Sequence, residues 1–280
     1  MSIPMSISEA FILGLVQGLT EFLPVSSSAH LVFVQHLLGF KEPLLFFDIV
    51  LHLGTLVSLF IYFSADLAHL IRDSFDAVFF LLRRKRTEEI FELAPYSRWA
   101  LGLLIASFPT GVIGFLFKDW FESLFGSLGA VGWALVGTSV ILGLTFYFEK
   151  GKKGIKKTGW VDFLFIGALQ GVAIIPGISR SGTTIAAGLF RGLDRETAFR
   201  FSFLLAIPAI LGAALLELKK GFLLAKGDLF PLGVGFLTAL VFGYIAISLL
   251  SKLVRKGRLH FFALYTLLLA FLVLFSSGRL

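Results

Sequence analysis

The chain of 280 residues contains no cysteine, which excludes disulfide bonds, thiol catalysis and thiolate metal sites. Charged residues are also scarce, at 15% of the chain. No lysine or arginine precedes Lys41, so the apolar N-terminus lacks the basic region of a cleaved signal peptide. With so few charges, the chain has little polar surface to present to water.

Hydrophobic residues make up 57% of the chain, the mean hydropathy is +0.90, and phenylalanine alone contributes 33 residues. A soluble domain cannot hide that much apolar surface, so the composition indicates an integral membrane protein. Segments long enough to cross a bilayer as helices are expected at 44–63, 99–117, 128–148, 198–218, 231–250 and 260–275.

The net charge of +7 indicates membrane topology and gives no reason to expect nucleic acid as a partner. Basic residues cluster at 83–86, 150–157 and 252–258, in three loops that fall on one side if six helices alternate. The positive-inside rule makes that side cytoplasmic. Both termini are therefore expected to face outward.

Two stretches of the chain resemble each other, at 14–30 and 167–184. With one residue of slippage, the matching pairs are Gln17 with Gln170, Gly18 with Gly171, Pro24 with Pro176, and Ser27 with Ser179. The chain is thus predicted to be a single membrane domain, 1–280, built from two repeats, 1–148 and 149–280.

The segments around both motifs are too short to form pairs of membrane spans. We therefore expect re-entrant helical hairpins at 6–40 and 161–191, with Pro24 and Pro176 at their tips. Each half would hold one hairpin and three spans, which inverts the second half relative to the first. The sequence predicts an all-α integral membrane protein, with six transmembrane helices plus two re-entrant hairpins in an inverted-topology repeat.

The second motif has the parts of a phosphate cradle. Its glycines let backbone N–H groups approach an anion, its hydroxyls donate hydrogen bonds, and an arginine can grip two oxygens. The candidate phosphate ligands are Gly177, Ser179, Arg180, Ser181 and Thr184, joined by Ser26 of the first motif. The alternative is that Arg180 only pairs with Glu21 and locks the two repeats together.

In the first motif, Glu21 and His30 flank the serines 26–28. A hydroxyl nucleophile needs a base within hydrogen-bond reach and often a carboxylate that orients this base. Ser27 is the preferred nucleophile only because it aligns with Ser179 in the other repeat. A serine cap on the returning helix, a buried hydrogen-bonded histidine and a cation-binding glutamate are the alternatives.

Other polar residues carry weaker signals. Asp48 either lines the pocket or simply begins its span. The remaining histidines are expected to be packing or interfacial residues; they are His36, His52, His69 and His260.

Three linked motifs, at 17–21, 24–30 and 176–184, resemble the bacitracin-resistance family of undecaprenyl-diphosphate phosphatases. The resemblance implies a hydrolase of the bacterial cytoplasmic (inner) membrane that removes the terminal phosphate of a C55 polyprenyl diphosphate. It further implies an outward-facing site, a divalent cation (Mg²⁺ or Ca²⁺) and bacitracin resistance, since bacitracin sequesters the substrate. Gln17 stands where the family also allows glutamate, so this chain offers only a neutral ligand there.

For the reaction, we expect Arg180 to hold the phosphates and Ser27 to attack the terminal phosphorus. His30 would be the base, with roles as nucleophile or leaving-group acid left open, and direct attack by water remains an alternative. Glu21 would orient His30 or, with Gln17, hold the cation. The competing function is an inverted-repeat transporter or flippase of a polyprenyl phosphate or another phosphate anion. The sequence leaves a homodimer open.

Overall fold

The computed structural model describes residues 5–40, 42, 44–148, 150–221 and 229–278, and this part of the chain is helical throughout apart from one isolated bridge. Six of its helical segments are long and apolar enough to cross a membrane. They are α3 (Leu45–Tyr62), α6 (Pro95–Leu116), α8 (Leu128–Leu144) with η1 (Thr145–Tyr147), α11 (Arg195–Gly221), α12 (Leu229–Arg255), and η3 (Leu259–Phe261) with α13 (Phe262–Ser277). These are the six segments expected from hydropathy, so the protein is a multi-pass membrane protein.

Four shorter helices form two hairpins around the repeated motifs. The first hairpin consists of α1 (Ile7–Phe22) and α2 (Ser27–Leu37), and the second of α9 (Trp160–Val172) and α10 (Arg180–Phe190). Their lengths of 16, 11, 13 and 11 residues fall below the roughly 20 that a membrane span needs.

The polar segment 64–98 is mostly helical. It forms α4 (Ser64–Leu82), α5 (Thr87–Leu93) and the start of α6. A short helix, α7 (Lys118–Phe125), connects α6 to α8, and η2 (Ile155–Lys157) precedes α9.

Local sequence explains where the hairpin helices begin. Ser6 and Glu9 form a capping box at the start of α1, which satisfies backbone donors that the first turn leaves free. The serine side chains of Ser26 and Ser179 cap α2 and α10 in the same way. The helix starts therefore pair Ser26 with Ser179, one residue away from the sequence alignment that pairs Ser27 with Ser179.

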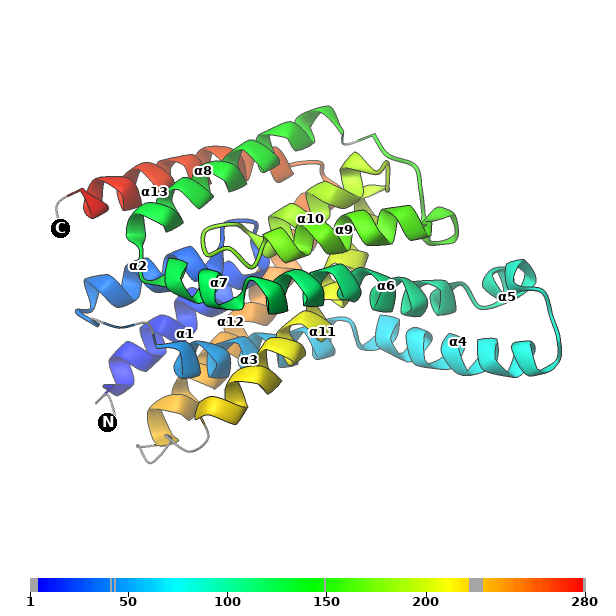
Figure 1. Cartoon of the computed structure of the whole chain (residues 1–280), viewed down its shortest axis with the longest axis horizontal. Coiled ribbons are helices and arrows are strands. Elements are labelled where there is room, and N and C mark those ends of the chain that lie inside the picture. Colours follow the sequence, from blue (N-terminus) through cyan, green and yellow to red (C-terminus); the bar gives the residue numbers. More distant parts are fainter. Residues whose placement is uncertain (1–4, 41, 43, 149, 222–228, 279–280) are drawn as a thin grey trace.

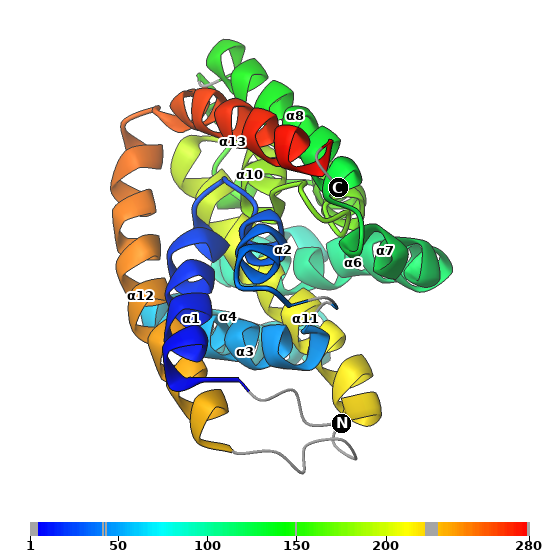
Figure 2. The ribbon, with the colours of Figure 1, turned by 90° about the vertical axis from the view of Figure 1, so that its left-hand side faces the viewer.

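The two hairpins lie at the centre of the molecule and point in opposite directions. Figure 1 shows the start of α1 and the end of α13 at one end of the molecule, the terminus end, and the α4–α5 pair projecting from the other end. The α1–α2 hairpin starts from the terminus end, whereas the α9–α10 hairpin starts from the opposite end (Figure 1). Seen from the terminus end, α2 lies amid a ring that includes α12, α13, α8, α6, α11 and α3 (Figure 2).

Glycines let each hairpin pack closely on a long helix from the other half of the chain. Helix α1 packs along α12, where a Cβ at Gly14 would lie 2.6 Å from the carbonyl oxygen of Gly235. Helix α9 packs along α6, where a Cβ at Gly167 would lie 2.0 Å from the carbonyl oxygen of Ala106. Both contacts use the first glycine of a matching Gly-x-x-Gln-Gly sequence. In each repeat a glycine thus lets the backbones of two helices approach closely.

Candidate active site

The turns of the two hairpins meet in the protein interior. The Gly177 N–H donates to Ser28 Oγ at 3.3 Å, and Ser181 Oγ donates to the Leu23 carbonyl oxygen at 3.2 Å. Gly177 has a φ of +103°, and a Cβ there would lie 2.5 Å from the carbonyl oxygen of Val131. Only glycine fits this turn without strain or a shift of the neighbouring helix.

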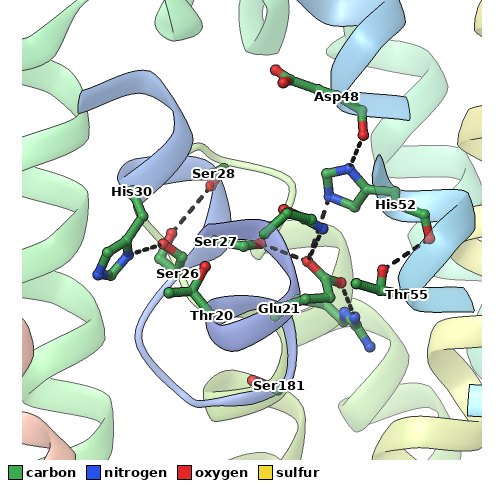
Figure 3. A network of polar contacts seen from close by, with 12 residues as sticks. Thr20, Glu21, Ser26, Ser27, Ser28, His30, Asp48, His52, Thr55 and Ser181 are labelled. Atoms are coloured by element: carbon green, nitrogen blue, oxygen red, sulfur yellow. Dashed lines mark hydrogen bonds and ion pairs between the residues drawn. The ribbon is translucent and has the colours of Figure 1, made fainter. Parts of the chain in front are cut away.

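Glu21, in the last turn of α1, is the centre of a buried polar network (Figure 3). Its Oε2 accepts from Ser27 Oγ at 2.6 Å and from Gln17 Nε2 at 3.0 Å. Its Oε1 accepts from the guanidinium of Arg180, the first residue of α10. The carboxylate therefore joins the first repeat to the second through a charge-assisted hydrogen bond.

Arg180 pairs with Glu21, as in the alternative that the sequence left open. This ion pair does not use all of the N–H donors of Arg180. One of its guanidinium nitrogens, Nη1, is buried and has no hydrogen-bond partner. A buried donor without a hydrogen-bond partner lowers the stability of the folded protein by about 1 to 3 kcal/mol, and by more when the donor is charged. Arg180 thus uses part of its guanidinium on Glu21, while Nη1 has no partner among the described residues.

His52 also faces Glu21, a position that the sequence did not reveal. The expectation that it is a packing or interfacial residue is wrong, because its Nε2 lies 3.5 Å from Glu21 Oε2 (Figure 3). It belongs to α3, outside both repeated motifs. The one available signal was its position one helical turn after Asp48, on the same face of a membrane helix.

His30 lies on the other side of Ser26 from this network (Figure 3). Its Nδ1 lies 2.8 Å from the Ser26 carbonyl oxygen, which can only accept, so Nδ1 carries the proton. Its Nε2, 2.8 Å from the Tyr265 hydroxyl, is then the acceptor in the neutral ring. The hydroxyl of Ser27 is hydrogen-bonded to Glu21, and no contact joins it to His30 among the interactions found in the described residues.

Ser26, whose carbonyl oxygen accepts from the His30 ring, has an unusual backbone conformation. Its φ is +66°, in the left-handed region that residues other than glycine rarely adopt. Its carbonyl oxygen accepts from both the backbone N–H and the ring of His30. Strained residues of this kind cluster at functional sites, where the surrounding structure sustains them.

The remaining residues of the predicted cradle bond mainly within their own hairpin or to neighbouring helices. Ser179 Oγ accepts from the Gly182 N–H at 3.1 Å, and Thr184 Oγ1 donates to the Arg180 carbonyl oxygen at 2.8 Å. Thr184 also contacts the hydroxyl of Ser202 on α11. The structure therefore brings Gln17, Glu21, Ser27 and Arg180 together. The hydroxyls of Ser179 and Thr184 are hydrogen-bonded to other partners.

Asp48 is buried in the first turn of α3, but its carboxylate does not contact Glu21 or His52. The Gln35 amide donates to Asp48 Oδ1 at 2.7 Å, and the carboxylate points away from the ring of His52 (Figure 3). Its backbone carbonyl oxygen instead lies 2.6 Å from Nδ1 of His52. Asp48 therefore touches the network through its main chain.

The side chains here do not make a resident metal site. Both oxygens of Glu21 already accept from strong donors, and the only other predicted ligand atom, Gln17 Oε1, is neutral. That oxygen is buried without a hydrogen-bond partner. Within the described residues there is no group of three or more histidines and carboxylates that could hold a metal ion. Mg²⁺ and Ca²⁺ take six or more oxygen ligands, so the substrate and water would have to supply most of them.

A cavity of about 880 Å³ lies next to the network. Most of its lining is apolar and comes from the end of α1 and from the junction of α12 and α13; the residues are Leu19, Thr20, Leu23, Val25, Leu253, Arg258, Phe261, Phe262 and Tyr265. Tyr265 forms part of this lining and also bonds to His30. Tyr265 therefore places the cavity next to His30.

Comparison with known proteins agrees with these features. The chain is 44% identical over 277 residues to an undecaprenyl-diphosphatase of Carboxydothermus hydrogenoformans, with 97% of this chain and 98% of the relative covered. It is 45% identical over 279 residues to an undecaprenyl-diphosphatase of Desulfosudis oleivorans, covering 97% of this chain and 98% of the relative. An undecaprenyl-diphosphatase of the archaeon Methanobrevibacter smithii is 43% identical over 274 residues, with 98% of both chains covered.

The family described as bacitracin resistance protein BacA matches residues 10–272, which cover both hairpins and all six long helices apart from the start of α1 and the end of α13. With this match and full-length relatives above 40% identity, the chain belongs to the BacA family.

Proposed function

We propose that this protein is an undecaprenyl-diphosphatase, a membrane hydrolase that releases the terminal phosphate of undecaprenyl diphosphate. Its full-length relatives carry that name. The observation in the structure that carries the proposal is the meeting of Glu21 and Ser27 from one hairpin with Arg180 from the other. A hydroxyl, a carboxylate and an arginine with a free donor are the groups that phosphoryl transfer requires.

In the proposed reaction, Arg180 binds the terminal phosphate through its unpartnered nitrogen. Ser27 Oγ then attacks the terminal phosphorus, and the bond from this phosphorus to the bridging oxygen breaks. The hydroxyl proton passes to Glu21, which already accepts it at 2.6 Å, and polyprenyl phosphate leaves. Glu21 gives this proton to the departing polyprenyl phosphate. It then takes a proton from the water that attacks the phosphoserine and returns it to Ser27 Oγ as inorganic phosphate leaves.

Glu21 fits the role of proton acceptor for Ser27 better than His30 does in this arrangement. The Ser27 hydroxyl is already directed at Glu21, whereas both ring nitrogens of His30 have other partners. His30 would need a change of side-chain conformation to reach Ser27. Its predicted role as base, nucleophile or leaving-group acid, and direct attack by water, stay predictions that the variants below separate.

We propose a divalent cation as a counter-ion that arrives with the diphosphate. This follows from the shortage of free protein ligands around Glu21, whose oxygens are engaged by Arg180, Gln17 and Ser27. Mg²⁺ is commonly bound by substrate phosphates and water with one or two carboxylates.

The prenyl chain of the substrate is proposed to occupy the cavity beside α1, α12 and α13. The cavity is mainly lined by leucine, valine and phenylalanine, and it reaches the polar site at Tyr265. Burying a CH₂ group contributes about 0.8 kcal/mol, so even a few isoprene units would add substantially to binding.

We also propose that the two hairpins are re-entrant and that the halves form an inverted repeat, with the site open to the outside. The short hairpin helices, their opposite directions and the matched glycine packing support this. The start of α1 and the end of α13 lie at the end opposite the basic loop 83–86, in keeping with an outward orientation of that end.

The test is phosphate release from undecaprenyl diphosphate by the purified protein in detergent, where no transport can occur. Wild-type protein should release phosphate, Arg180→Ala should nearly abolish release, and Arg180→Lys should recover little. A lysine presents a point charge and cannot keep one planar arm on Glu21 while the other holds phosphate. Wild-type turnover in the lysine variant would contradict the role given to Arg180.

The second candidate is a transporter or flippase of an anionic lipid. The opposed hairpins that meet near the centre favour it, because many transporters bind their substrate between broken helices of inverted repeats. A carrier needs Arg180 but has no use for a serine directed at a carboxylate. Absence of phosphate release in detergent, with lipid movement in vesicles, would favour the carrier.

A further inference from the structure

His52 has one ring nitrogen that is fixed and one that is left incompletely paired. The Asp48 carbonyl oxygen accepts from Nδ1 at 2.6 Å, which fixes the ring and its Nδ1 proton. The Thr55 hydroxyl donates to the His52 carbonyl oxygen at 2.8 Å on the same helix. Only Nε2 remains for other partners, and its position is set by α3.

The contact between His52 Nε2 and Glu21 Oε2 is longer than a hydrogen bond. The 3.5 Å separation exceeds the usual 2.7 to 3.2 Å of an N–H···O hydrogen bond. When His52 is protonated, its Nε2–H therefore lacks a full hydrogen bond. A phosphate oxygen placed beside Glu21 could accept from it.

Exposure also distinguishes His52 from its neighbours. Its side chain is 30% exposed, against 5% for Glu21 and 15% for Arg180. His52 is thus the most exposed of these three side chains.

Besides the divalent cation proposed above, the bound diphosphate needs hydrogen-bond donors beyond those of Arg180. Glu21 and Arg180 cancel each other, while a diphosphate monoester carries at least two negative charges. Among the described residues, Arg180 and His52 are the two basic side chains that form ion pairs with Glu21. They contact opposite oxygens of the carboxylate, Oε1 and Oε2, and so flank it from two helices.

We propose that His52 is a substrate-binding residue, whose Nε2 donates to a phosphate oxygen on the side of Glu21 opposite Arg180. This deepens the proposed function and rests on it. The diphosphate would lie between Arg180 on α10 and His52 on α3, with Ser27 at the terminal phosphorus. The pocket for the head group is then formed by a transmembrane span as well as by the two hairpins.

The experiment measures inorganic pyrophosphate binding by calorimetry and the kinetics of phosphate release, both on the full-length protein in detergent. His52→Ala should weaken pyrophosphate binding and raise KM, each by about ten- to a hundredfold, the effect of one hydrogen bond to a charged group. His52→Gln should recover most of both losses, because its amide nitrogen can replace the Nε2 donor at similar reach. His69→Ala is the matched control, since His69 stacks on Tyr96 with a centroid distance of 5.2 Å, apart from the network.

A lower kcat in His52→Ala with unchanged KM and unchanged pyrophosphate affinity would overturn the proposal and leave His52 as a residue that only positions Glu21. Equal pyrophosphate affinity in wild type and His52→Gln is compatible with the proposal, whereas wild-type affinity in His52→Ala is not. If wild type binds pyrophosphate in a His52-dependent way but releases no phosphate from undecaprenyl diphosphate, the proposed hydrolase fails while the binding site stands. Melting temperatures of all variants identify any loss of folding. If His52→Ala does not fold, the pyrophosphate affinity and KM of His52→Gln decide the proposal: values close to wild type support it, and a loss of both contradicts it.

Discussion

Substitutions of Ser27 and of Glu21 should have non-additive effects on the activity of the enzyme. Ser27 Oγ donates to Glu21 Oε2 at 2.6 Å, so each residue depends on the other for its place in the reaction. Ser27 and His30, although three residues apart on α2, share no hydrogen bond found among the described residues. We therefore expect strong coupling for the first pair and weak coupling for the second.

The magnitudes separate a nucleophile from a simple donor. A hydrogen bond to a charged group is worth about 1.5 to 3 kcal/mol, so Ser27→Ala should cost about ten- to a hundredfold if Ser27 only holds phosphate or Glu21. If Ser27 attacks phosphorus, the loss should be far beyond a hundredfold, and adding Glu21→Gln should lower the rate little further.

The assay is a pair of double-mutant cycles on kcat/KM, using phosphate release in detergent. One cycle combines Ser27→Ala with Glu21→Gln, and the other combines Ser27→Ala with His30→Ala. Residues in contact couple by about 0.5 to 3 kcal/mol, whereas independent residues add to within about 0.5 kcal/mol. We expect the Glu21 cycle in the first range, at its upper end, and the His30 cycle in the second.

Strong non-additivity between Ser27 and His30, with additivity between Ser27 and Glu21, would refute this reasoning. It would mean that substrate binding turns His30 toward Ser27 and restores the serine–histidine pair expected from the sequence. A Ser27→Ala enzyme that keeps a tenth of its activity would instead exclude the covalent route and leave water as the nucleophile.

Three further predictions follow from the packing, the His30 contact and the topology. Gly167→Ala should destabilise the protein by about 1 to 3 kcal/mol in thermal unfolding, because the added Cβ would meet the backbone of α6 at 2.0 Å; Gly111→Ala, with nothing within 4 Å, should be neutral or better. Tyr265→Phe keeps the ring but removes the hydroxyl bonded to His30, and should change kcat/KM without lowering the melting temperature by more than a few degrees; an unchanged kcat/KM would show that this hydrogen bond has no part in turnover. Single cysteines near Gly278, but not near Lys256, should react with an impermeant thiol reagent on intact spheroplasts, and the reverse pattern would invert the proposed orientation.

The length and position of the membrane helices could be predicted from sequence because hydropathy is a local property. A span needs about 20 apolar residues, and segments such as 44–63 and 128–148 meet that requirement without reference to the rest of the chain. The repeated motif likewise identified Glu21, Ser27 and Arg180 as members of one site, since charged residues in an apolar chain need partners.

Only the tertiary structure decided which of these residues touch. Ser27 bonds to Glu21 and not to His30 because the His30 ring is held by the Ser26 carbonyl oxygen and the Tyr265 hydroxyl, and spacing along the sequence carries no information on that choice. His52 entered the network because α3 packs beside α1, which places its ring 31 positions away in sequence yet 3.5 Å from the same carboxylate. Contacts of this kind depend on helix packing and side-chain conformation, which a hydropathy pattern does not specify.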